Sequence, residues 1–541
     1  MSTETETPDV APSVRRWVLF KWKNARRILI ALALVITLIA VFFTFENWRG
    51  RRAWQAFVAE MKAAGEPLEL KELLPPMPAD DQNFAQIPLL KPLLNYGKGT
   101  NGQIVWEDAE TKTRLETLHF APKIPGKAWS DRHSGRETDF ALWQTHLRDD
   151  TNFHFPVGQV SASLIDKEEG VEGAADVGRL HRYDTNHAVA DVVLALKKYD
   201  VDFAALHGAV ERPYIQFPVH YEEGFATLLT HLQVLRNFGK IARLKAVAAL
   251  AQNRAGDAWK EFELIVRMSE AADSEPVLIS QLVRIAMLNE AMEIAWEGMA
   301  KRRWSVEHLR SIEERLRGVD QVKAYVFSMR GERLLALRGL DLIRNRPDAL
   351  GDFEELEQGM GLFRNVPFGW YQNNLVELGR AFEEYALPYA DLAQRRFHVV
   401  EARRKGIEFD EELKVFSINR MFVNLLFPAY RKVLDRCAEC QVSVDELRVA
   451  CAVELFRLEN KSLPKELDEV APMLGVPLPK DPTTGEDYRF RLEADTGAYL
   501  IYSPGGDGVD DGGVSVAKDK GKGNSRNEFG ADLGDWVWRG I

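Results

Sequence analysis

The sequence predicts a mainly α-helical protein with a single transmembrane helix, a helical ectodomain and a small C-terminal α+β unit. Three observations lead to this prediction. Residues 28–45 form an uncharged apolar run, residues 185–438 carry apolar side chains at helical spacing, and residues 439–541 combine an amphipathic helix with alternating strands. Of the 541 residues, 46% are hydrophobic and 28% are charged, which is typical of globular domains rather than disordered chains.

The apolar run at residues 28–45 (ILIALALVITLIAVFFTF) contains only Thr37 and Thr44 as polar side chains. At about 1.5 Å per residue it approaches the roughly 30 Å hydrocarbon core of a bilayer. A buried helix of a soluble protein would normally have a polar face, and the following residues offer no small-residue cleavage site. We therefore expect a retained membrane anchor, with a cleaved signal peptide as the alternative.

Basic residues flank this run unequally and predict its orientation. Upstream lie Arg15, Arg16, Lys21, Lys23, Arg26 and Arg27, and downstream lie Arg49, Arg51 and Arg52. The excess of positive charge before the run favours an N-terminus in the cytoplasm. Residues 1–27 are therefore predicted to be a cytoplasmic tail, residues 28–45 the transmembrane helix, and residues 46–541 to lie outside the cytoplasm.

Residues 46–184 are predicted to form an irregular α+β juxtamembrane region. A helix at residues 51–64 continues from the anchor, and six prolines follow between residues 67 and 92. Nine of the eleven histidines fall between residues 119 and 231, namely His119, His133, His146, His154, His181, His187, His207, His220 and His231. Their spacing matches no common zinc motif, so we assign no ligands to them. An envelope hydrolase that uses this region is the alternative function.

Residues 185–438 carry the clearest helical pattern. Helices are predicted at residues 188–198, 224–254, 257–272, 275–301, 306–317 and 320–344, and an aromatic-rich helix at 373–404. Small residues between 246 and 258 resemble the crossing points of tetratricopeptide-type helix pairs, although a plain helical bundle explains them equally well. A repeat-like domain typically presents a groove for a peptide or helix, so we expect a protein partner.

Charge and cysteine content exclude several classes of protein. The net charge of −11 argues against a general nucleic-acid-binding protein, so no nucleic-acid partner is expected. Three cysteines, Cys437, Cys440 and Cys451, are too few for a disulfide scaffold, although one bridge is possible outside the cytoplasm. Cys437 and Cys440 have C-x-x-C spacing without a second pair, so a zinc or redox site is not expected there.

Residues 439–541 contain several short motifs in a fixed order. A helix with Phe456-Arg457 precedes Pro464 and Leu467, and P-x-D-P-x-x-G-x-x-Y follows at residues 479–488, Y-S-x-G-x-D-G at 502–508 and DLGDW at 532–536. In this order they resemble the globular domain of the major pseudopilin of type II secretion systems. The resemblance lacks the family's processing site before the apolar helix, and about 390 residues separate that helix from this domain. We therefore expect a binding or structural module rather than a pseudopilus subunit.

The loop at residues 503–513 (SPGGDGVDDGG) is the candidate metal site. Three closely spaced carboxylates repel one another unless a cation lies between them, and hard divalent cations prefer oxygen ligands. The pseudopilin resemblance implies calcium, held by Asp507, Asp510 and Asp511, with a carbonyl from Ser503 or Val509 and with Asp532 in reserve. A polar insert between Gly513 and Asp532 departs from the family pattern, and a metal-free turn is the alternative.

The whole chain also resembles uncharacterised membrane-anchored proteins of planctomycete- and verrucomicrobia-like bacteria, through LISQLVRIA at residues 278–286 and the acidic loop. This likeness implies a bacterial origin and brings no activity with it. The sequence therefore predicts a membrane-anchored periplasmic binding or scaffold protein with a calcium-stabilised tail, associated with a secretion or pilus-like machine. No catalytic residues are predicted.

Overall fold

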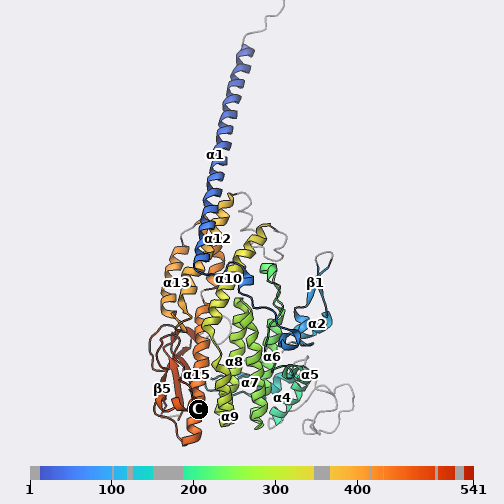
Figure 1. The fold of residues 1–541 in the computed structure, drawn as a ribbon, viewed down its shortest axis with the longest axis vertical. Coiled ribbons are helices and arrows are strands. Elements are labelled where there is room, and N and C mark those ends of the chain that lie inside the picture. The colour runs from blue at the N-terminus through green and yellow to red at the C-terminus, as the bar shows by residue number, and fades with distance from the viewer. Residues whose placement is uncertain are drawn as a thin grey trace, which may run out of the picture.

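The computed structural model describes the backbone of residues 13–99, 103–118, 126–149, 187–345, 366–414, 417–430, 432–493, 497–517 and 529–541. The protein is mainly helical with a few small sheets, as the sequence predicts. Figure 1 shows helix α1 standing out from one end of the ectodomain and the C-terminal strands at the other end. Residues 1–12 of the predicted tail, and His119, His154 and His181, lie outside the described residues.

Helix α1 spans Ser13–Ala63 and joins two segments that the sequence analysis treats separately. Among the described residues, this is the one helix long and apolar enough to cross a membrane. Its apolar side chains from Ile28 to Phe42 are exposed, because the ectodomain does not cover this part of the helix. An exposed apolar helix near the N-terminus fits a membrane anchor and also a signal sequence.

The last turns of α1 belong to the ectodomain. Phe57 and Met61 are buried and form a small apolar cluster with Val376 of α12 (Phe368–Tyr385). The two helices run parallel, since Gly50 lies against Gly369 near the start of α12 and Phe57 lies against Gly379 further along. The C-terminal turns of α1 are therefore part of the folded core.

The described residues between 64 and 149 form short elements that cover one side of the helical core. They include 3₁₀ turns at Leu70–Glu72, Asp80–Gln82, Phe84–Gln86, Lys91–Leu93 and Gly126–Ala128, the antiparallel pair β1 (Tyr96–Lys98) and β2 (Ile104–Trp106), and helices α2 (Ala109–Glu116) and α3 (Phe140–Asp149). The buried side chain of Asn83 fixes this layer. Its Nδ2 donates to the Gln216 backbone carbonyl at 2.7 Å, and its Oδ1 accepts from the backbone amides of Ala85 and Gln216.

The helical core lies between residues 188 and 345. Its helices are α4 (Ala188–Leu196), α5 (Asp200–His207), α6 (Thr230–Ala251), α7 (Ala255–Ser269), α8 (Leu278–Ala300), α9 (Val306–Arg317) and α10 (Gln321–Asn345). The six helices predicted between residues 188 and 344 correspond to α4 and to α6–α10, and α9 has the predicted bounds, whereas α5 was not predicted. Helices α6, α7 and α8 pack against one another and contribute many of the fully buried side chains.

The predicted single helix at residues 373–404 is wrong. Helix α12 ends at Tyr385, a 3₁₀ turn follows at Leu387–Tyr389, and the short strands β3 (Ala390–Asp391) and β4 (Arg396–Phe397) form a hairpin before α13 (Val399–Leu413). Pro388 explains the interruption, because proline has no backbone N–H and its ring crowds the preceding turn of a helix. Helix α14 (Met421–Leu426) then leads towards the C-terminal part.

The C-terminal part consists of one long helix and two antiparallel sheets. Helix α15 (Val433–Asn460) starts twelve residues before the helix predicted at residues 445–460, and it packs on α8, α9 and α10. One sheet has the order β5 (Arg489–Leu492), β6 (Tyr499–Ser503), β9 (Trp536–Gly540), and the other pairs β7 (Ser515–Ala517) with β8 (Phe529–Gly534). Tyr499 and Trp538 share one hydrophobic core with α15 and the helices before it. The strands are therefore packed onto the helical part through α15.

Candidate functional site: an arginine-lined cavity

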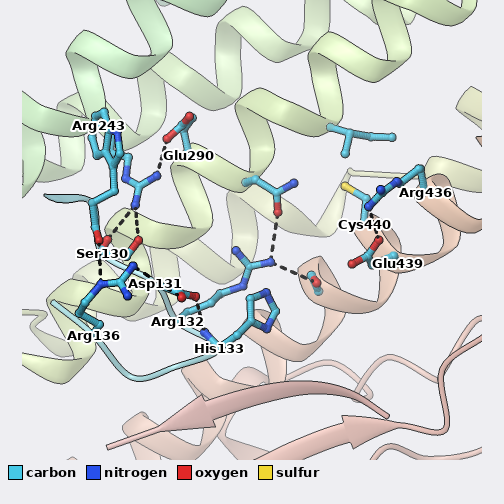
Figure 2. Close-up of a pocket in the computed structure, with 14 residues that line it drawn as sticks. Ser130, Asp131, Arg132, His133, Arg136, Arg243, Glu290, Arg436, Glu439 and Cys440 are labelled. Carbon is cyan, nitrogen blue, oxygen red and sulfur yellow. Dashed lines mark hydrogen bonds and ion pairs between the residues drawn. The ribbon is translucent and has the colours of Figure 1, made fainter. Parts of the chain in front are cut away.

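A polar cavity of about 350 Å³ lies where α6, α8 and α15 meet the loop between the 3₁₀ turn at Gly126–Ala128 and α3. The loop contributes Ser130 to His133 and Arg136, and it folds back on itself through the pair Asp131 and Arg136. In Figure 2, Arg132 lies between Arg243 and Glu290 on one side and Arg436, Glu439 and Cys440 on the other. Four guanidinium groups therefore line one cavity, from elements far apart in the sequence.

The Arg132 side chain is 6% exposed and reaches across the cavity. Its guanidinium donates to Glu293 at 3.0 Å, to the Asn289 side-chain oxygen at 3.1 Å and to the Ser443 hydroxyl at 3.4 Å. Burying a charged group is costly unless it is paired and hydrogen-bonded. These contacts satisfy that condition, and they link the loop to α8 and α15.

Arg243 of α6 holds the other wall. Its guanidinium donates to Glu290 at 2.6 Å and to the Ser130 carbonyl at 2.9 Å, and it lies over the Trp129 ring at 4.5 Å from the ring centre. Its buried Nε has no hydrogen-bond partner in the structure. Neighbouring Glu290 and Glu293 raise the pKa of Arg243 against the opposing effect of burial, so this charge is permanent.

The remaining lining groups limit the chemistry of the cavity. Burial, and next the charge of Arg132, lower the pKa of His133 to about 3, so its imidazole is neutral at physiological pH. Burial raises the pKa of the Cys440 thiol to about 12, so it is not a thiolate nucleophile. The cavity is lined by four guanidinium groups, the groups that proteins use to bind carboxylates and phosphates, and by three carboxylates, those of Asp131, Glu290 and Glu439, which pair with three of them.

The other histidines that the structure describes lie elsewhere. His207 faces Glu261 of α7 at 3.3 Å, His220 faces Glu222 at 3.0 Å, and buried His231 faces Glu275 at 2.7 Å while stacking on Phe217. His133 is the one histidine among those described that lines the cavity. The described part of the histidine-rich stretch thus supplies one group to this site, and His207, His220 and His231 make separate polar contacts.

The acidic loop at residues 503–513 connects β6 to β7. Two of its carboxylates accept hydrogen bonds from backbone amides and so stabilise turns. Asp507 accepts from the Val509 amide at 3.0 Å and from the Gly534 amide at 3.3 Å. Asp510 accepts from the Gly512 amide at 2.9 Å and pairs with Arg489 at 2.6 Å. A calcium ion among these acids would compete with Arg489 for the Asp510 carboxylate.

The sequence analysis missed Asp535, which anchors the same loop. Its buried carboxylate accepts from the amides of Asp511 at 3.2 Å and Gly513 at 2.6 Å. The buried Ser503 hydroxyl accepts from the Gly505 amide, and Val509 is exposed. Strand β8 contains Asp532, whose side chain lies outside those described. Among the described side chains, no group of three or more His, Cys, Asp or Glu is arranged to hold a metal ion. The calcium site stays a prediction.

The cavity residues could not be found as a motif, because more than 300 positions separate Arg132 from Ser443. The available signal is charge on an apolar helix face. Arg243 lies in the apolar stretch IARLKAVAALA, and Glu290 and Glu293 lie in the similarly apolar α8. Charged residues in such positions are buried only when they are paired, so they indicate a polar site inside the core.

No family model, no curated protein and no solved structure matches this chain. The pseudopilin resemblance of residues 439–541 and the likeness to planctomycete- and verrucomicrobia-like proteins therefore stay expectations from the sequence.

Proposed function

We propose that this protein is a single-pass membrane-anchored binding protein of the bacterial envelope, with its N-terminus in the cytoplasm and its ectodomain in the periplasm. The observation that carries the proposal is the continuity of α1, which passes from an exposed apolar run of membrane-spanning length into the buried contact with α12. A cleaved signal peptide would have no reason to continue into the folded core. The asymmetry of basic residues around the run supports the orientation.

The ligand in this proposal is a compact anion that carries carboxylate or phosphate groups and enters the arginine-lined cavity. Arg132 and Arg243 are held in place by acidic and polar partners, so their guanidinium groups are preorganised before a ligand arrives. Arg436 is less constrained, because its side chain is 42% exposed and pairs with Glu439 at 3.3 Å. We assign to Arg436 the contact with the incoming anion at the cavity mouth.

Two further roles rest on the sequence motifs alone. The pseudopilin resemblance supports a scaffold role beside a secretion or pilus-like machine, and it supports calcium as the stabilising ion of the acidic loop. Both roles are expectations for the C-terminal part, and calcium addition or removal tests the second of them.

Fractionation and topology mapping test the anchor. The full-length protein should stay in the membrane pellet after alkaline carbonate extraction, and a C-terminal alkaline phosphatase fusion should be active because that enzyme folds only outside the cytoplasm. Recovery of the intact chain in the soluble cytosolic fraction would contradict the proposal. Recovery of a soluble, shortened periplasmic form would instead identify a cleaved signal peptide.

Thermal titration tests the ligand. The full chain in detergent is heated with increasing inorganic phosphate, citrate or, as an uncharged comparison, glucose. Phosphate or citrate should raise the unfolding midpoint, because a ligand that binds only the folded state stabilises it. Arg436→Gln should abolish the shift, whereas Arg303→Gln, at an exposed position outside the cavity, should retain it. Equal shifts in both variants would show that the anions act elsewhere.

A further inference from the structure

The first turn of α12 is fixed to α1 at the end of the apolar run. The Gly369 amide donates to the Asn47 side chain at 3.0 Å, and the Trp370 indole donates to the Glu46 carboxylate at 2.9 Å. A Cβ atom on Gly369 would lie 1.8 Å from the Glu46 carbonyl oxygen, so only glycine permits this approach. The position of the turn along α1 is therefore set to within a residue or two.

That position coincides with the edge of the predicted membrane span. The apolar run ends at Phe45, and residues 28–45 in a helix are about 27 Å long, close to the roughly 30 Å of a hydrocarbon core. Glu46 is the first charged residue after the run and is buried against α12. If the run spans the bilayer, the first turn of α12 lies at the boundary between hydrocarbon and headgroups.

Exposed aromatic side chains surround this turn. Phe368 is 38% exposed, and Phe45 and Trp48 of α1 are 54% and 55% exposed. The Trp370 ring meets the Phe42 ring edge to face, with ring centres 6.0 Å apart. Trp48 and Trp370 are of the type that concentrates at membrane–water interfaces, because an indole combines an apolar ring with one polar N–H group. Two different segments of the chain thus present aromatic groups at one level.

Basic groups lie beside the same aromatic set. The Arg344 guanidinium of α10 lies 3.8 Å from the centre of the Phe368 ring, and Arg52 lies 5.6 Å from the centre of the Trp48 ring. Arginine near a membrane surface is attracted to anionic lipid headgroups. Figure 1 places the upper ends of α10 and α12 at the end of the ectodomain from which α1 emerges.

We infer that the first turn of α12 is a second membrane-contacting element. Phe368 enters the interfacial layer at the level of Phe45, with the Arg344 guanidinium packed against its ring. The partner of this surface is the bilayer through which α1 passes, and the inference rests on the anchor of the proposed function. The ectodomain then has two contacts with the membrane, α1 and the first turn of α12, and the second contact holds it against the membrane surface.

Depth-dependent quenching tests this surface in the full chain. The three native cysteines are buried, so an added exposed cysteine can be labelled selectively with an environment-sensitive dye. Labelled Phe368→Cys, Phe45→Cys, Leu34→Cys and Val201→Cys proteins are reconstituted into phosphatidylethanolamine–phosphatidylglycerol vesicles. Quenching by spin-labelled lipid and by aqueous iodide is then measured. Position 34 reports the anchor, position 45 gives the interfacial depth on α1 itself, and the highly exposed Val201 of α5 reports the aqueous reference.

The dyes at positions 368 and 45 should be quenched several-fold more by spin-labelled lipid than the dye at position 201, and should be protected from iodide. Iodide access at 368 equal to that at 201, with lipid quenching retained at 34 and 45, would overturn this inference and leave the anchor standing. Loss of lipid quenching at 34 as well would overturn both. A thermal midpoint matching that of the unsubstituted protein confirms that Phe368→Cys is folded.

Discussion

The Arg333 guanidinium donates to the Glu66 carboxylate at 3.0 Å and so joins α10 to the chain that leaves α1, across 267 positions of sequence. Arg330 donates to the same carboxylate at 2.9 Å. The Arg333 side chain is 1% exposed. Paired charges, buried or partly buried, together with apolar packing, therefore hold the C-terminal end of α1 in place.

Acid should weaken this junction. Burial raises the pKa of Glu66, but Arg330 and Arg333 together outweigh burial, so the pKa lies below the usual 4.5. A carboxylate with a lowered pKa in the folded state stabilises the protein above its unfolded pKa, and this stabilisation is lost as the pH falls towards the folded pKa. We expect part of the acid loss of stability, below about pH 5, to disappear in Glu66→Gln. Unfolding midpoints of the full chain between neutral and acidic pH measure this. Glu60→Gln, at an exposed position of α1, should behave like the unsubstituted protein.

The contact between α1 and α12 depends on two glycines. A Cβ on Gly50 would lie 2.3 Å from the Gly369 Cα. We expect Gly50→Ala to lower the free energy of unfolding by about 1–3 kcal/mol, because the helices must move apart. Gly256→Ala in α7 is the matched control, since nothing lies within 4 Å of its Cβ position. Equal midpoints for the two variants would contradict the close approach.

Arg132 and Glu293 should show strong energetic coupling. Removing either partner leaves a buried charge, which costs about 3–5 kcal/mol. We expect Arg132→Leu and Glu293→Leu each to be strongly destabilising, and the double variant to be far less destabilised than the sum of the two. Denaturant unfolding of all four proteins gives the coupling free energy. Additive effects would show that the two side chains do not interact in solution.

Calcium should stabilise the C-terminal loop if the pseudopilin resemblance holds. Saturation to about 100 times the dissociation constant would add about 2.7 kcal/mol to the free energy of unfolding. The test is the unfolding midpoint of the full chain with calcium, with magnesium and with chelator. Asp507→Asn combined with Asp510→Asn should abolish the calcium effect. Identical midpoints with calcium and chelator would remove calcium from the proposal.

Asp535→Asn separates the structural role of the loop from ion binding. Its carboxylate holds the amides of Asp511 and Gly513 whether or not a cation is present. We expect this variant to lose about 1–3 kcal/mol of stability in chelator, because charge-assisted hydrogen bonds to the backbone are weakened. A variant as stable as the unsubstituted protein would show that the Asp535 carboxylate is not needed to hold the loop.

The three cysteines should be unreactive in the folded protein. Cys437, Cys440 and Cys451 are free and buried in α15, and burial raises the pKa of each thiol. A thiol reagent reacts with the thiolate, so native protein should give almost no labelling, and protein in denaturant should give three labels per chain. Rapid labelling of the native protein would contradict this packing.

Local patterns predicted the helices well, because each depends on spacing within a few turns. The apolar run, the bounds of α9 and the alternating strands β5 and β6 were recognisable in this way, whereas β7, β8 and β9 were not predicted. The break at Pro388 was a local signal too, but the aromatic stripe that continues past it concealed the end of α12. Helical spacing on both sides of a proline does not make one helix.

The cavity could not be predicted, because its geometry arises from contacts between distant elements. Nothing near Arg132 in the sequence indicates that Asn289 and Ser443 will accept from its guanidinium. In the acidic loop the sequence did show a cluster of carboxylates, and this cluster led to the calcium hypothesis. The buried carboxylate that holds the loop, Asp535, lies outside that cluster in the sequence. Composition reveals a cluster, whereas only packing reveals which carboxylates are already engaged.

The uninterrupted course of α1 has a mechanical consequence. Without a hinge between the apolar run and the contact with α12, the helix and the ectodomain must turn as one rigid body. If α1 spans a membrane as proposed, a change in its tilt would therefore also move the C-terminal strands at the far end of the molecule. An event within the lipid could thereby reposition a surface well beyond the reach of the headgroups.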